Sequence, residues 1–136
     1  MQLQTLQSAI THYCHITNET VDLSDYTIPQ ADCLFNPKTN KYLKVLPSNE
    51  FIIWAIGERE GLSFFQLDQC YGFMKNFVPF IKDIMRITNT EWIVTATQRN
   101  PKSHVKKWKM EHLSHLDYEY EGRFYHVLKG HVSNLK

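Results

Sequence analysis

The run Phe51–Ile56, with the sequence FIIWAI, most constrains the fold of this chain. A strand with one face in water alternates apolar and polar residues, whereas a strand covered on both faces is apolar throughout. Every residue of this run is apolar. It therefore predicts the central strand of a sheet that carries helices on both sides.

Short apolar segments divided by turn-forming residues lie on either side of this run. They are Cys33–Phe35, Tyr42–Leu46 and Leu62–Leu67, and Gly57–Gly61 is interpreted as the turn before the last of them. This pattern is typical of consecutive antiparallel strands.

The N-terminal third contains one clear periodic segment. Leu3, Leu6, Ile10 and Tyr13 recur at helical spacing and predict an amphipathic helix from Leu3 to Tyr13. The following residues, His15–Asp32, have no clean period and form either a loop or a short second helix.

Helical spacing returns after Gly72. Asn76 is a candidate cap, and Pro79 fits only in the first turn of the helix that follows. The apolar residues of this predicted helix are Phe77, Phe80, Ile81, Ile84 and Ile87.

A strand from Glu91 to Thr97 then runs into a basic helix from Pro101 to Met110. Asn100 and Pro101 are interpreted as its N-cap and its first residue, because Asn can accept an orphan amide and Pro has none to lose. A strand-to-helix turn of this kind presents backbone amides to an anion.

Composition excludes several classes of protein. The 15 basic and 14 acidic residues give a net charge of +1, so no global field attracts nucleic acid or an anionic membrane. The N-terminal residues do not have the pattern of a signal peptide, and no apolar run approaches the length of a membrane span. Cys14, Cys33 and Cys70 are odd in number, which is typical of a reducing compartment. We expect a single cytoplasmic domain over residues 1–136.

Two segments carry a resemblance to a known family. Gln69-Cys70-Tyr71-Gly72-Phe73-Met74 precedes the second helix, and Arg99-Asn100-Pro101-Lys102 precedes the third, while a hairpin divided by Gly122 closes the chain. In this order and in these segments, Tyr42 to Lys129 resembles the GNAT superfamily of N-acetyltransferases. Thr90 to Gly130 resembles small acetyltransferase-like proteins encoded by phages. The resemblance implies an α+β fold, with an acetyltransferase-like, mixed, mostly antiparallel sheet flanked by helices on both faces.

The resemblance also implies a function. With acetyl-CoA as cofactor, the chain would transfer an acetyl group to a primary amine. The cofactor would lie between strands Leu62–Leu67 and Glu91–Thr97, where its pantetheine arm pairs with exposed backbone. The loop at Gly72 would hold the pyrophosphate, Asn100 the pantetheine arm, and Arg99 or Lys106 the outer phosphates. The cofactor-binding residues implied in this way are Gln69, Gly72, Phe73, Arg99, Asn100 and Lys106.

The chain departs from the family's pattern at two places. Met74 stands where the family keeps Gly or Ala, and Lys107 and Trp108 stand where many members carry the Tyr that protonates the leaving thiolate. The catalytic residues are therefore unknown. The proton donor is either absent or one of Tyr118, Tyr120 and Tyr125. The candidate bases by position are Glu58, Glu60 and Asp68, each of which is more simply a turn or edge residue of the sheet.

Simpler interpretations exist for the same residues. Gly72 can be a turn between strand and helix, and Asn100 can be a plain helix cap.

The basic run has two interpretations as well. On a helix, Lys102, Lys106 and Lys109 share a face that is either solvated or binds phosphates. Val105 and Trp108 are interpreted as core anchors.

The alternative function belongs to another class. It is a non-catalytic phage or virion-associated protein that retains the acetyltransferase fold and binds a protein partner or a second copy of itself. Its location would then be the host cytoplasm or the virion.

Histidines raise the question of a metal. His12, Cys14 and His15 are close in sequence, as are His112, His115 and Asp117, but neither group has a zinc spacing with a second pair. From spacing alone we expect no metal site.

Overall fold

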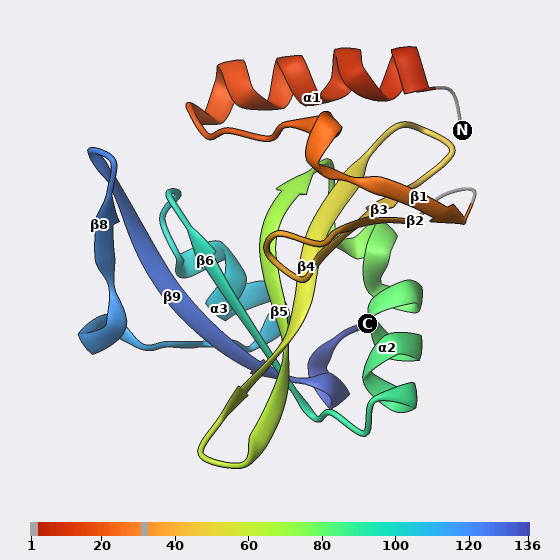
Figure 1. Ribbon diagram of the computed structural model, residues 1–136. Coiled ribbons are helices and arrows are strands. Elements are labelled where there is room, and N and C mark those ends of the chain that lie inside the picture. Colours follow the sequence, from red (N-terminus) through yellow and green to blue (C-terminus); the bar gives the residue numbers. More distant parts are fainter. Residues whose placement is uncertain (1–2, 31–32) are drawn as a thin grey trace. The chain divides into compact units, whose positions relative to one another are not determined.

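The computed structural model describes residues 3–30 and 33–136 (Figure 1). The chain forms two compact units. The first comprises residues 1–55 and 69–74, and the second comprises residues 56–68 and 75–136. Strands β4 (Phe51–Arg59) and β5 (Leu62–Tyr71) each contribute residues to both units.

The first unit consists of a helix on an antiparallel sheet in the order β1-β2-β3-β4. Its elements are α1 (Leu3–Thr17), β1 (Thr27–Gln30), β2 (Cys33–Asn36), β3 (Lys41–Val45) and the first residues of β4. Leu43 pairs with Ile53, and Val45 pairs with Phe51. This register places apolar side chains of neighbouring strands side by side.

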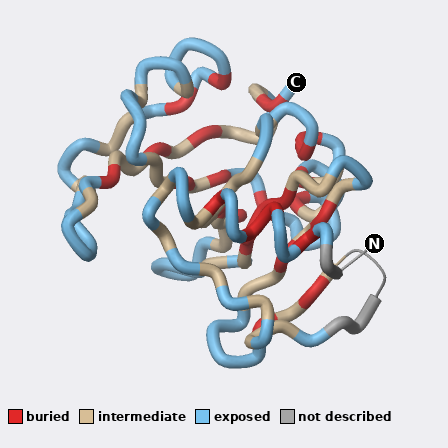
Figure 2. Tube along the Cα trace, turned by 90° about the horizontal axis from the view of Figure 1, so that it is seen from above, coloured by how far each residue is buried: buried red, intermediate tan, exposed pale blue. Residues whose placement is uncertain are grey.

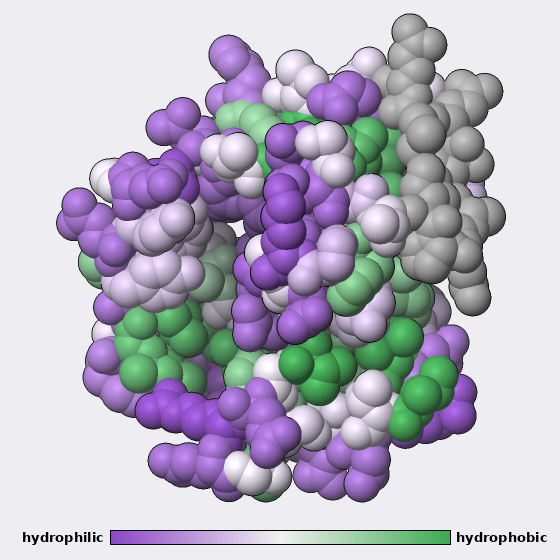
Figure 3. Space-filling view, in the orientation of Figure 1, coloured by the Kyte–Doolittle hydropathy of each residue, from purple (hydrophilic) through white to green (hydrophobic). Residues whose placement is uncertain are grey.

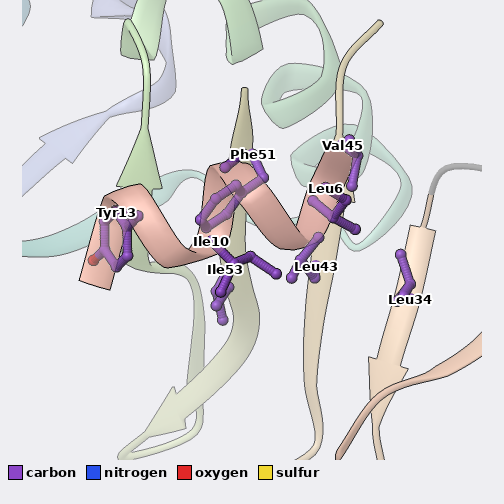
Figure 4. Packing of buried hydrophobic residues seen from close by; sticks show 9 residues of the cluster. Leu6, Ile10, Tyr13, Leu34, Leu43, Val45, Phe51 and Ile53 are labelled. Carbon is purple, nitrogen blue, oxygen red and sulfur yellow. The ribbon is translucent and has the colours of Figure 1, made fainter. Parts of the chain in front are cut away.

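The core of the first unit lies between α1 and this sheet. Leu6, Ile10 and Tyr13 are buried against the strands, where they meet Phe51 and Ile53 (Figure 4). The predicted helical stripe is confirmed for these three residues, and the side chain of the fourth, Leu3, lies outside the described residues. Helical periodicity therefore identified the face of α1 that packs on the sheet.

The central strand begins as predicted. Its first residues, Phe51–Trp54, are all buried, whereas Ile56 is 38% exposed. The apolar run is thus covered on both faces over its first part only.

The segment His15–Asp32, predicted as a loop or a short second helix, combines several elements. The helix α1 continues to Thr17, a single 3-10 turn spans Leu23–Asp25, and β1 follows. The side chain of Asp22 accepts a hydrogen bond from the amide of Ser24 at 3.0 Å and so begins this turn. Ala31 and Asp32, at the end of the predicted segment, lie outside the described residues.

The second unit contains a mixed sheet. Its elements after β5 are a 3-10 turn (Met74–Phe77) leading into α2 (Val78–Ile87), β6 (Trp92–Thr97), α3 (Lys102–Trp108), β7 (Glu111–His112), a 3-10 turn (Ser114–Leu116), β8 (Tyr118–Tyr120) and β9 (Arg123–His131). The strand order is β5-β6-β9-β7, with β8 on β9. The pair β5–β6 is parallel, and the pairs that β9 makes are antiparallel.

Helix α2 forms as its apolar spacing predicts. Pro79 lies in its first turn, and Val78, Ile81 and Met85 are buried. The predicted cap was wrong, because Phe77 occupies the N-cap position and makes no side-chain cap hydrogen bond. Ile87 is the last residue of the helix, and its side chain is exposed.

The turn predicted at Gly57–Gly61 is shorter than expected. Strand β4 continues to Arg59, and only Glu60 and Gly61 form the turn, with φ of 54° and 79°. Positive φ at both central residues is typical of two-residue hairpins. Gly57 lies inside the strand, where a Cβ would come within 2.4 Å of the Phe64 ring.

Figure 2 shows exposed turns alternating with buried stretches along the trace.

Candidate functional site

The parallel ladder between β5 and β6 ends before β6 does. Its last pair joins Leu67 to Thr95, and the hydroxyl of Thr95, which is buried, donates to the Leu67 carbonyl at 2.9 Å. Strand β6 continues beside β9 through Ala96 to Thr97. Of two successive residues in an antiparallel pair, one directs its backbone groups away from the partner strand. The end of β6 therefore offers backbone hydrogen-bonding groups on the side where β5 has left it.

Side chains of the turn after β6 accept hydrogen bonds from the backbone amides of the same turn. The Thr97 hydroxyl accepts from the Arg99 amide at 3.1 Å, and Asn100 Oδ1 accepts from the Lys102 amide at 3.0 Å. The Asn100 side chain thus accepts from the first amide of α3, although it stands one position before the N-cap that was predicted for it. Pro101 occupies the N-cap position, so its prediction as the first helical residue was wrong by one position.

Helix α3 carries the basic run at its surface. Trp108 is buried as predicted, but Val105 is 41% exposed and is not a core anchor. The helix ends at Trp108, and Lys109 follows it in a left-handed conformation with φ of 51°. Lys109 therefore lies beyond the helical face that was predicted to include it, whereas Lys106 lies exposed on α3.

One histidine of α3 escaped sequence analysis. His104 is half-buried, and its Nδ1 has no hydrogen-bond partner among the described residues. Burial, and then the positive charge of Arg99, lower the pKa of His104. The lowered pKa favours the neutral form of the imidazole.

The loop at Gly72 is occupied by a carboxylate from its own unit. Glu50 Oε2 accepts from the Phe73 amide at 3.0 Å, and Glu50 Oε1 accepts from the Ser48 hydroxyl at 2.8 Å. Gly72 has φ of +112°, and a Cβ on it would lie 2.0 Å from Glu50 Oε2. Backbone amides of this kind bind anions in general. The amide that the resemblance assigns to a phosphate thus already binds an anionic side chain.

Gln69 joins β5 to the segment after α1. Its Nε2 donates to Glu19 Oε1 at 3.0 Å, and the Tyr13 hydroxyl donates to the same carboxylate. Burial, and then Glu19, raise the pKa of Tyr13. The side chain of Gln69 therefore takes part in a network inside the first unit.

The six predicted cofactor-binding residues divide between the two units. Gln69, Gly72 and Phe73 belong to the first, in which Gly72 and Phe73 meet at Glu50. Those of the second unit are Arg99, Asn100 and Lys106, of which the first two share one turn. Sequence analysis missed Glu50, and its only signal was its place in the loop before the central strand.

Comparison with solved structures identifies the fold. No family model matches the sequence, and no curated protein matches it. The structure of FeeM, an N-acyl amino acid synthase from uncultured soil microbes, matches with a TM-score of 0.57 at 6% identity, over 96% of this chain and 92% of that chain. The chain has a GNAT-like fold. A crystal structure of the NatC complex bound to Gag peptide and CoA matches with a TM-score of 0.46 at 12% identity, over 67% of this chain and 70% of that chain.

The expected fold class is thereby confirmed, as an α+β fold with a mixed, mostly antiparallel sheet. Within the GNAT-like fold, the candidate bases differ in their surroundings. Glu58 and Glu60 are exposed at the β4–β5 turn. Asp68 directly follows Leu67, the last residue of β5 that pairs with β6, and its Oδ1 accepts from Gln66 Nε2 at 2.6 Å. Asp68 is thus the candidate base at the point where the ladder ends.

The candidate proton donors lie on the closing hairpin of the GNAT-like fold. Tyr125 is buried, and its hydroxyl accepts from Arg123 Nε at 2.9 Å. Tyr118 stacks on Tyr125 at 5.1 Å, and both Tyr118 and Tyr120 are exposed. Among the described helices, none is long and apolar enough to cross a membrane.

Proposed function

We propose that this protein binds an acyl-CoA, with the pantetheine arm extended along the end of β6, and transfers the acyl group to a primary amine. The observation that supports this most is the end of the β5–β6 ladder at Leu67 and Thr95, while β6 continues to Thr97. An extended arm can pair with an open strand edge as an added strand does. An N-acyl amino acid synthase of similar fold is consistent with this class of reaction.

Asp68 is the base in this proposal. An alkylammonium must lose a proton before its nitrogen attacks, and the carboxylate of Asp68, next to the end of the ladder, would accept that proton. The nitrogen then bonds to the thioester carbonyl carbon, the carbon–sulfur bond breaks, the thiolate leaves, and the nitrogen gives up its second proton to leave a neutral amide.

The buried Trp108 does not prevent this reaction. A thiol has a pKa of about 8.5, so a leaving thiolate is basic enough to accept the proton that the acylated nitrogen releases, directly or through water. A protein acid at the position of Trp108 is therefore dispensable.

A second function is favoured by Glu50. Its carboxylate binds the Phe73 amide, and a diphosphate taking that amide must displace it. A chain that no longer binds acyl-CoA, and that uses the retained fold to bind a protein partner, would tolerate this contact. Apolar side chains are also exposed, among them Leu62 and Phe73. On the face seen in Figure 3, however, hydrophobic residues form several separate areas among hydrophilic ones.

Calorimetric titration with two thioesters distinguishes these functions. Acetyl-CoA carries the diphosphate, whereas S-acetylpantetheine carries only the arm. We expect both to bind, because the arm contacts β6 in either case. No heat and no thermal stabilisation with either thioester at millimolar concentration would reject the transferase proposal and favour the second function.

A further inference from the structure

Three side chains that are distant in sequence converge on one carboxylate in the second unit. His112 is the last residue of β7, Asp117 follows the 3-10 turn Ser114–Leu116, and His126 lies on β9. Pairing of His112 with Leu128 on β9, and a hydrogen bond from the Leu113 amide to the Val127 carbonyl at 2.8 Å, hold these segments together. The convergence is thus built by the backbone of the sheet.

The geometry of the cluster is that of a ligand set. His112 Nε2 lies 2.9 Å from Asp117 Oδ2, and His126 Nδ1 lies 3.0 Å from the same oxygen. One ligand atom from each of the three residues lies within 4.8 Å of the others. The Val127 amide donates to Asp117 Oδ1 at 2.9 Å and so fixes the carboxylate. The exposed fractions of the side chains, 28% for His112, 25% for His126 and 11% for Asp117, leave the cluster open to ions from solvent.

We propose that His112, Asp117 and His126 bind a divalent transition-metal ion, for which Zn²⁺ is the probe, with water completing the coordination. Imidazole nitrogens select such ions over Mg²⁺ and Ca²⁺, which prefer oxygen ligands. Bonds of about 2.0–2.1 Å place tetrahedral Zn²⁺ ligands roughly 3.3 Å apart. The two nitrogen–oxygen separations of 2.9 and 3.0 Å need to widen by only a few tenths of an ångström, and the two ring nitrogens lie within 4.8 Å of each other.

The metal would clip the C-terminal strands together. It joins β7, the segment before β8, and β9, and so closes the chain between His112 and His126. Because the ligands converge only in the folded chain, binding stabilises that state. This role is independent of acyl transfer.

Sequence spacing missed the cluster because its second histidine comes from another strand. The group considered from sequence included His115, which is exposed on the 3-10 turn and lies outside the cluster. His126 takes its place.

Titration of the chelator-treated full chain with Zn²⁺, followed by calorimetry and by thermal unfolding, tests the proposal. We expect one equivalent to bind and to raise Tm. His112→Gln and His126→Gln should each weaken binding by more than about 100-fold, since loss of a ligand exceeds the 10- to 100-fold cost of losing a supporting residue. His115→Gln is the matched control and should bind as the parent does.

Asp117→Asn keeps an acceptor for the Val127 amide and covers the case in which a histidine variant does not fold. It should fold by circular dichroism and lose Zn²⁺ binding. Co²⁺ should give the visible absorption of a low-coordinate nitrogen and oxygen site in the parent and lose it in Asp117→Asn. Absence of saturable Zn²⁺ binding by the parent, or undiminished binding by folded His126→Gln and Asp117→Asn, would overturn the proposal.

Discussion

The carboxylate of Glu50 accepts a hydrogen bond from the backbone amide of Phe73 at 3.0 Å. It lies so close over Gly72 that a Cβ there would be 2.0 Å from Glu50 Oε2. An internal anion therefore occupies the loop that the GNAT resemblance assigns to the pyrophosphate of the cofactor.

Neutralising Glu50 tests that assignment. Glu50→Gln keeps an acceptor for Phe73 but removes the negative charge. If the Gly72 loop takes the diphosphate, acetyl-CoA affinity should rise about 5- to 10-fold, the equivalent of roughly 1 kcal/mol for a partly solvated charge. Affinity for S-acetylpantetheine should stay the same. Calorimetry measures the affinity for each thioester, with Glu58→Gln as the control. Equal changes in affinity for the two thioesters would show that Glu50 does not compete with the diphosphate.

Gly72 should be sensitive to substitution for two reasons. Its φ of +112° strains any side chain, and Glu50 fills the space of a Cβ. Gly61 also has a positive φ, +79°, but has nothing within 4 Å of a Cβ. We expect Gly61→Ala to lower the free energy of unfolding by about 1–2 kcal/mol through strain alone, and Gly72→Ala to lower it further. Urea unfolding measures the free energy of unfolding of both variants. Equal losses would show that the Glu50 side chain moves aside without cost.

His104 should make stability depend on pH. Because burial and Arg99 lower its pKa in the folded state, the unfolded state binds a proton first as pH falls below about 6.5. Stability due to this residue is therefore present at neutral pH and is lost in acid. His104→Gln should lose less unfolding free energy than the parent between pH 7 and pH 5. Parallel pH profiles from urea unfolding would contradict this.

Asp68 should matter for transfer rather than for binding. Asp68→Asn should lower the rate of acyl transfer by about 10²- to 10⁴-fold, the usual contribution of a general base, and leave thioester affinity unchanged. Raising the pH should restore part of the rate, because more of the amine is then unprotonated. Glu58→Gln is the control. A greater loss of transfer rate in Glu58→Gln than in Asp68→Asn would identify Glu58, rather than Asp68, as the base.

Local periodicity predicted the elements that pack through one stripe. Leu6, Ile10 and Tyr13 follow the helical period, and Phe51–Trp54 are buried as a continuous apolar run predicts. Packing against the core requires apolar side chains at these positions, so the sequence pattern predicts their burial. The prediction for Ile56 was wrong because the second part of β4 leaves the core.

Contacts between segments that are distant in the chain could not be predicted from the sequence. Glu50 lies ten residues before Glu60, and Gly72 lies eleven after Gly61, so a hairpin with its turn at Glu60-Gly61 brings Glu50 opposite the Gly72 loop. The longer turn predicted from Gly57 hid this register. A shift of one or two residues in a turn changes every cross-strand neighbour.

The end of β6 is where the central proposal is tested most directly. Amide hydrogen exchange of Ala96–Gln98 should be compared with and without S-acetylpantetheine, with Ile93, inside the β5–β6 ladder, as the internal reference. We expect the thioester to slow exchange within Ala96–Gln98 and to leave Ile93 unchanged. Unchanged exchange across Ala96–Gln98 at saturating thioester would contradict binding along β6.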